Sequence, residues 1–166
     1  MLDFPALLQQ FAAAVVTNDG AALAGLFTEN GVYEDGFFGA HQGRDEIIAM
    51  LARFHETGAD YRWDFFDPLA DGRIGYARWR FSYASKMPGA EGRPVVFEGT
   101  SLFELRGERI ARYSEAFDRG VALVQQDFPA ERLKKILLKA AQAQNATPEC
   151  REHLARFAAA PKQAAS

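Results

Sequence analysis

A series of long stretches that alternate between aromatic and polar residues occupies the middle of the chain, and this alternation constrains the fold more than any other feature. It runs through 61–66 and 78–83, where aromatic side chains take every second position, and the strand-like pattern continues in 95–105 and 109–117. Successive side chains of a strand point to opposite faces of a sheet, so a two-residue period predicts strands with one apolar face. The Asp-Gly pair at 71–72 marks a turn. These features predict a meander of long antiparallel strands with helices packed on one face.

Helical periodicity comes before these strands. Apolar residues recur at helical spacing over 4–15, and Asp19 is suited to cap a short second helix that runs to Asn30. A short strand is expected at 32–35, and a third helix over 44–54 with acidic residues in its first turn. Helices followed by an antiparallel meander predict a fold of the α+β class.

A helical extension is expected after the strands. Pro129 opens a fourth helix with an apolar stripe and several basic residues, and Pro148 starts a brief fifth helix. The fourth helix has two interpretations, a basic amphipathic element on a membrane surface or a helix packed on its own domain or on a partner subunit. The short stripe without aromatic anchors favours packing. We predict one domain over residues 1–125 and an extension over 126–166 whose end, 161–166, is disordered.

Charge and cysteine usage exclude several classes of protein. The formal net charge of −3 and a pI near 5.6 argue against sequence-independent electrostatic binding of nucleic acid, so no nucleic-acid partner is expected. Cys150 is the only cysteine, which leaves no disulfide and no thiolate zinc cluster and fits a reducing compartment. We find neither a secretory signal nor a membrane-spanning stretch, so a soluble cytoplasmic protein without a membrane partner is expected.

Neither a metal nor a cofactor is predicted. The three histidines, His41, His55 and His153, are not spaced to give two ligands on one helical face with a third nearby. The chain also shows no Gly-rich phosphate loop, no Walker-type motif and no serine nucleophile elbow.

The order of the elements, together with three segments, resembles the nuclear transport factor 2-like superfamily, in particular its SnoaL-like and ketosteroid isomerase-like branches. The segments are LFTENGVYED at 26–35, GRDEI at 43–47 and YSEAFD at 113–118. The resemblance implies a cone-shaped, cystatin-like α+β roll in which three N-terminal helices pack on a curved antiparallel sheet. It also implies a pocket that opens near the helices and a homodimer through the sheet face. It implies no particular reaction, because this fold hosts enzymes of several kinds and proteins without catalysis.

Two carboxylates are the candidates for catalysis. Asp35 falls where the isomerase-like members place a general base, and an apolar pocket would raise its pKa toward a range useful for proton transfer. The alternative is a solvated turn aspartate in front of Gly36. Glu115 shares a strand face with Tyr113 and Phe117, so it lies near those rings if they are buried. The alternative for Glu115 is a structural carboxylate paired with an arginine.

The hydrogen-bond donors of the related enzymes are missing. The isomerase donors, a tyrosine and a protonated aspartate, correspond to Phe11 and Ser101 here, which argues against true ketosteroid isomerase activity. In the epoxide hydrolase-like branch an Asp–Arg–Asp set is used, and Gly99 and Ser101 stand at the first Arg and Asp positions, so that only Glu115 remains.

The aromatic content of 13% has two readings, a bulky packed core or the lining of a cavity for an apolar ligand. The residues expected around the two carboxylates, as ligand contacts or pocket walls, are Tyr33, His41, Trp63, Trp79, Phe81, Tyr83, Phe97, Ser101, Phe103, Tyr113 and Phe117. For His41, the alternative is an exposed loop residue.

Three functions remain open. The first is a cofactor-independent acid–base enzyme, of isomerase, cyclase or hydratase type, that acts on a small hydrophobic carbonyl compound. The second is a ligand-binding or dimeric scaffold protein without catalysis. The third is an interaction module that uses the open sheet face.

Overall fold

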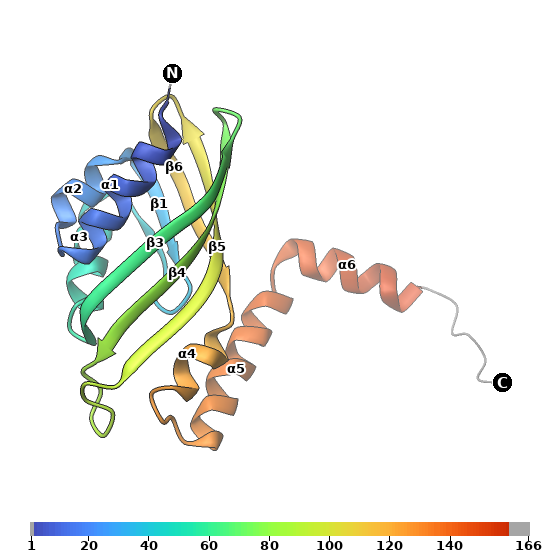
Figure 1. Ribbon diagram of the computed structural model, residues 1–166. Coiled ribbons are helices and arrows are strands. Elements are labelled where there is room, and N and C mark those ends of the chain that lie inside the picture. The colour runs from blue at the N-terminus through green and yellow to red at the C-terminus, as the bar shows by residue number, and fades with distance from the viewer. Residues whose placement is uncertain (1, 160–166) are drawn as a thin grey trace. The chain divides into compact units, whose positions relative to one another are not determined.

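The computed structural model describes residues 2–159 (Figure 1). The predicted disorder of 161–166 lies outside these residues. The chain forms two compact units, one up to Asp127 and one from Phe128.

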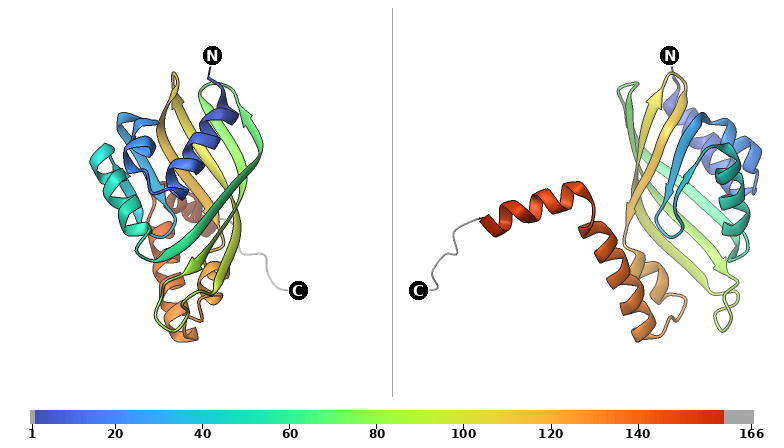
Figure 2. Two further views of the ribbon diagram at one scale, coloured as in Figure 1. Left: turned by 60° about the vertical axis from the view of Figure 1, so that its left-hand side comes forward. Right: turned by 180° about the vertical axis from the view of Figure 1, so that it is seen from behind.

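Helices lie on one face of the sheet in the first unit, as Figures 1 and 2 show. They are α1 (Phe4–Val16), α2 (Gly20–Gly25) and α3 (Arg44–Phe54), and a short α4 (Arg119–Val124) follows the last strand. The carboxylate of Asp3 accepts the Ala6 N–H at 3.0 Å at the start of α1, and Asp19 accepts the Ala22 N–H at 2.9 Å at the start of α2. These caps satisfy backbone donors that would otherwise be free at a helix start, and they explain where the two helices begin.

A curved sheet of six strands carries these helices. The strands are β1 (Phe27–Asp35), β2 (Gly39–Gln42), β3 (Gly58–Ala70), β4 (Ile74–Ser85), β5 (Pro94–Arg106) and β6 (Arg109–Phe117). Their order is β2-β1-β6-β5-β4-β3, and all neighbours are antiparallel except the parallel pair β1–β6. The predicted α+β fold, with helices packed on a curved sheet, is confirmed.

The start of the sheet differs from the prediction. The second helix ends at Gly25 rather than near Asn30, and β1 begins at Phe27. The reason is tertiary pairing, since Phe27 lies beside Ile110 of β6 and is fully buried. The pairing of β1 with β6 shifts register between Phe27 and Val32, which accommodates the residues between them. Pairing with β6 therefore prevails over the helical spacing in this segment. Neither β2 nor α4 was predicted, because four and six residues are too short to show a period.

The predicted alternation decides which face of the sheet is buried. In β4, Trp79 and Phe81 are buried, whereas Arg78 and Arg80, which alternate with them, are exposed. The buried face meets Phe11 of α1, which has no exposed surface and packs against several rings of the sheet. Its ring centroid lies 5.8 Å from that of Tyr33, 5.4 Å from Trp63 and 4.8 Å from Tyr113.

The second unit contains α5 (Ala130–Asn145) and α6 (Pro148–Ala159). Pro129 is the N-cap of α5, so this helix begins directly after the proline. No residue of α5 is fully buried, and Leu137 and Leu138 are exposed. Within residues 2–159, no helix is long and apolar enough to cross a membrane.

Candidate active site

Because β1 and β6 pair in parallel, the two candidate carboxylates lie near the same end of these neighbouring strands. Tyr33 of β1 lies beside Tyr113 of β6, and both side chains are buried on the helix-covered face. Two residues further along each strand come Asp35 and Glu115, which share that face because side chains alternate. The sequence predicted this face for Glu115 from its alternation with Tyr113.

Asp35 is buried, with 7% of its surface exposed, so it is not the solvated turn residue of the alternative reading. Its Oδ1 accepts the N–H groups of Phe37 and Phe38, both at 2.7 Å. These two bonds fix the turn between β1 and β2. No hydrogen bond among the described residues uses Oδ2.

Glu115 is half-buried as a residue, but both of its carboxylate oxygens have partners inside the protein. Oε1 accepts the Gly36 N–H at 2.9 Å, and Oε2 accepts the Tyr113 hydroxyl at 2.7 Å. The ion pairs found within residues 2–159 involve neither Glu115 nor Asp35. The alternative of an arginine-paired Glu115 therefore does not describe this site.

Burial shifts the acidity of both groups. Loss of solvation raises the pKa of Asp35, while the turn N–H groups, His41 and Arg119 oppose that shift. Loss of solvation and the nearby Asp35 charge raise the pKa of Glu115 to about 8. The two carboxyl groups therefore interact, because like charges in one site disfavour ionisation of both groups at once.

A chain of hydroxyl groups supports Glu115. Ser101, which has no exposed surface, donates to the Tyr113 hydroxyl at 2.9 Å, and Tyr113 in turn donates to Glu115. Burial is the main cause that raises the pKa values of Tyr33 and Tyr113 well above their usual range, and the Glu115 charge adds to it. Both tyrosines therefore remain neutral hydrogen-bond donors at physiological pH.

Most of the predicted wall residues form one aromatic cluster beside the pair. Its buried aromatic members are Tyr61, Trp79, Phe81 and Phe97, and the partly buried rings packed against them include Phe54, Trp63, Tyr83 and Phe117. Two predicted wall residues are not brought to the carboxylates. Phe103 is fully buried against Phe4, at 5.4 Å between ring centroids, and serves the core, whereas the ring neighbours of Tyr83 are Tyr61 and Phe81.

Phe37 and Arg119 belong to the site but were missed from the sequence. The Phe37 ring lies 5.2 Å from Phe117 and 6.2 Å from Phe97, so the turn held by Asp35 covers the aromatic cluster. Arg119 opens α4 and lowers the pKa values of both carboxyl groups through its charge. Its position two residues after Phe117 was the available signal.

Three ring nitrogens in this region are buried without a hydrogen-bond partner: His41 Nε2, Trp63 Nε1 and Trp79 Nε1. His41 of β2 is half-buried and lies beside Tyr33. It lowers the pKa of Asp35 through its charge, so it is close to the carboxyl pair. Buried polar groups without a partner are uncommon in native proteins, so each of these nitrogens needs an explanation.

Gly99 makes room for the Trp79 ring. A Cβ at Gly99 would lie 2.7 Å from the Ala116 carbonyl oxygen and would overlap Trp79 Cζ2. Gly99→Ala is expected to lower the free energy of unfolding by about 1–3 kcal/mol, because the overlap forces the ring or the strand to move. Urea unfolding measures this change. Gly25→Ala is the matched control, because a Cβ there meets nothing within 4 Å, and equal losses in both variants would contradict the prediction.

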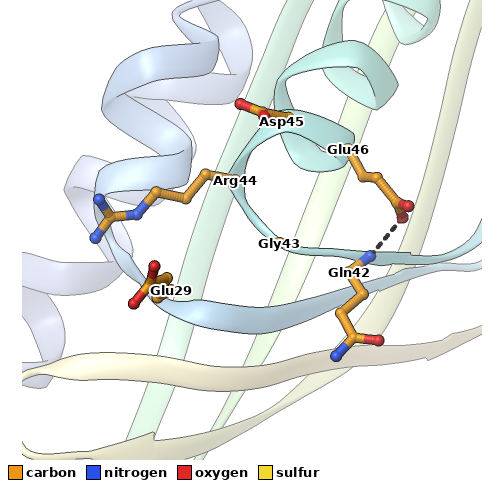
Figure 3. Close-up of a pocket in the computed structure, with 6 residues that line it drawn as sticks. All are labelled: Glu29, Gln42, Gly43, Arg44, Asp45 and Glu46. Carbon is orange, nitrogen blue, oxygen red and sulfur yellow. Dashed lines mark hydrogen bonds between the residues drawn. The ribbon is translucent and has the colours of Figure 1, made fainter.

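A separate hollow of about 750 Å³ opens at the start of α3 (Figure 3). Its lining residues are Glu29, Gln42, Gly43, Arg44, Asp45 and Glu46. In Figure 3, Glu46 reaches back to the Gln42 N–H, a bond of 2.8 Å that stabilises the helix start. None of the predicted site residues lines this hollow, and we place no chemistry there.

The family model for the SnoaL-like domain matches residues 8–113. No curated protein matches the chain. A hypothetical protein with a ketosteroid isomerase-like fold from Catenulispora acidiphila, solved in complex with trimethylamine, has a TM-score of 0.69 and 23% identity over 76% of this chain and 96% of that one. A proposed polyketide cyclase from Xanthomonas campestris has a TM-score of 0.62 and 20% identity over 74% and 95%.

An epoxide hydrolase of M. tuberculosis, of the LEH-like type, has a TM-score of 0.59 and 17% identity over 82% of this chain and 93% of that one. At these identities the likenesses show the fold alone. They agree with the six-stranded sheet and the helices that cover it.

Proposed function

The chain belongs to the SnoaL-like domain family, and from that premise we propose that it binds a small hydrophobic carbonyl compound and acts on it by acid–base catalysis without a cofactor. The observation that carries this proposal is the pair formed by the buried Asp35 and by Glu115, whose two carboxylate oxygens both have partners inside the protein. Its two members interact, and the pKa of one is raised to about 8. A pair that holds one proton near neutral pH can both remove and deliver protons.

The proposed reaction begins at the carbon next to the carbonyl group. Asp35 removes a proton from that carbon through Oδ2, and the C–H electrons form a C=C bond while the carbonyl oxygen gains charge. Neutral Glu115 donates its proton to that oxygen, so an enol forms. Reversal at another carbon gives an isomer, and attack of the enol on a second carbonyl of the same molecule closes a ring. The name of one structural relative, the proposed polyketide cyclase from Xanthomonas campestris, supports this reaction class.

The test uses 2-acetylnaphthalene, a flat apolar methyl ketone, in D₂O at pH 7. Proton NMR follows the replacement of its methyl protons by deuterium. The native protein is expected to accelerate this exchange with saturation, and heat-denatured protein is expected not to. A protein that binds the ketone but leaves the exchange rate at the buffer value would contradict the catalytic proposal.

A second candidate, a ligand-binding protein or scaffold without catalysis, rests on the turn that follows Asp35. Both carboxylates accept backbone N–H groups of Gly36, Phe37 or Phe38, and the Phe37 ring covers the aromatic cluster. In this reading the pair only holds the turn closed. Binding of the ketone without exchange would favour it.

A homodimer through the outer face of the sheet is also proposed, with the cytoplasm as the setting. That face exposes Leu69, Tyr76 and Val96, at 73%, 47% and 46% of their surfaces, among arginines. Sedimentation equilibrium is expected to give twice the chain mass of 18.4 kDa, and Tyr76→Glu is expected to shift the species to the monomer. A monomeric native protein at high concentration would contradict this proposal.

A further inference from the structure

The indole N–H groups of Trp63 and Trp79 are buried and have no acceptor among residues 2–159. Trp79 is 1% exposed, so water in bulk cannot reach its N–H group. A buried donor without a partner costs about 1–3 kcal/mol. These are the only two tryptophans of the chain, and both carry this cost.

Both indoles border the strand segment that carries Glu115. Tyr113, Glu115 and Phe117 share one face of β6 by alternation. The Trp63 ring centroid lies 6.5 Å from that of Tyr113, and the Trp79 centroid lies 5.7 Å from that of Phe117. The two rings therefore meet β6 on either side of the Glu115 position, and their own centroids are 5.9 Å apart.

Gly99 determines how Trp79 lies. Trp79 is paired with Gly99, and Gly99 with Phe117, across three neighbouring strands. The ring atoms that a Gly99 Cβ would meet are Cζ2 and Cη2, and Cζ2 is next to the carbon that bears Nε1. The nitrogen side of the indole thus rests over β5, next to the strand of Glu115.

We propose that Trp63 and Trp79 donate hydrogen bonds from their indole nitrogens to an acceptor oxygen of the ligand, beside Glu115. This inference rests on the proposed function in that the ligand is a planar apolar ketone or enol bound at the carboxyl pair. The positions of the family's usual donors hold Phe11, which cannot donate, and Ser101, whose hydroxyl is used by Tyr113. Two fixed neutral donors would stabilise the charge that develops on the ligand oxygen, and they do not titrate.

The donors also define a class of ligand. An indole nitrogen can only donate, so the site favours a molecule with an exposed acceptor oxygen over one of equal shape without it. Two probes of nearly equal shape, 2-acetylnaphthalene and 2-isopropenylnaphthalene, can test this preference. The second has a CH₂ group in place of the carbonyl oxygen.

The experiment is an ¹H–¹⁵N spectrum of the full chain, in which only two indole signals occur, during titration with each probe. Trp63→Phe and Trp79→Phe assign the signals. The ketone is expected to move at least one indole proton downfield and to bind about tenfold more tightly than the alkene, the usual worth of a hydrogen bond in a buried site. Both tryptophan variants are expected to lose that preference. Phe66→Leu, a control whose ring lies 4.8 Å from the guanidinium of the exposed Arg78, is expected to keep it.

Several results would overturn the inference. They are equal affinity for the two probes, ketone binding that leaves both indole signals unmoved, ketone preference retained in both tryptophan variants, and no binding of either probe. Cross-peaks between the indole protons and bound water that persist with the ketone would assign the donors to a structural water instead. Exchange of the ketone methyl protons is a separate readout. Exchange without indole shifts would overturn only the inference, and indole shifts without exchange would overturn only the catalytic proposal.

Discussion

Asp35→Asn is expected to slow the deuterium exchange of the 2-acetylnaphthalene methyl protons by about 100- to 10,000-fold, the usual worth of a general base. An amide oxygen is too weak a base to take a proton from carbon. It can still accept the N–H groups of Phe37 and Phe38, so the turn should keep its shape. The exchange rate by proton NMR is the measurement, and the affinity for the ketone should change little.

The matched control for this variant is Glu34→Gln, because Glu34 precedes Asp35 and its side chain belongs to the other face. There it forms an ion pair with Arg112 at 2.6 Å, half-exposed to solvent. Exposed pairs of this kind contribute at most about 1 kcal/mol, so the exchange rate of this variant should equal that of the native protein. A native rate in Asp35→Asn would assign the aspartate to the turn alone.

The sheet could be predicted where the chemistry is local. Alternation in 61–66 and 78–83 requires neighbouring side chains to face opposite ways, and Trp79 with Arg80 shows the outcome. Pairing between segments that are distant in the sequence leaves no comparable pattern in the sequence. The parallel contact of Phe27 with Ile110 depends on how β1 reaches β6, and it changed an expected helix end into a strand.

The sequence could predict which carboxylates belong to the candidate site, but not their burial or their pKa values. The face of Glu115 followed from the spacing to Tyr113, and the place of Asp35 from the family resemblance. The loss of solvation that raises both pKa values depends on packing, which the spacing of residues along the chain does not describe. The same holds for the unpartnered indole nitrogens, since whether a buried donor finds an acceptor is decided by all the surrounding groups.

The stability of the protein is expected to fall as the pH rises from about 5 to 9. The pKa of Glu115 is raised from 4.5 to about 8 in the folded chain, so between these values the folded state binds a proton that the unfolded state has lost. The stabilisation is therefore complete below the unfolded value and disappears as the pH passes through the folded one. Each pKa unit corresponds to about 1.36 kcal/mol, so Glu115 alone contributes at most on the order of 5 kcal/mol. Urea unfolding followed by tryptophan fluorescence at pH 5, 7 and 9 measures the fall.

Glu115→Gln separates this effect from all other titrations. Glutamine keeps the shape and an oxygen that can accept the Gly36 N–H, but it never ionises, so the variant should resemble the native protein at pH 5 and be the more stable one at pH 9. Tyr61 and Tyr83, whose burial raises their pKa values to about 12, stay neutral over the whole range. Glu34→Gln should retain the native pH dependence. Parallel stability curves for Glu115→Gln and the native protein would show that Glu115 ionises freely, and the shared-proton pair would then be wrong.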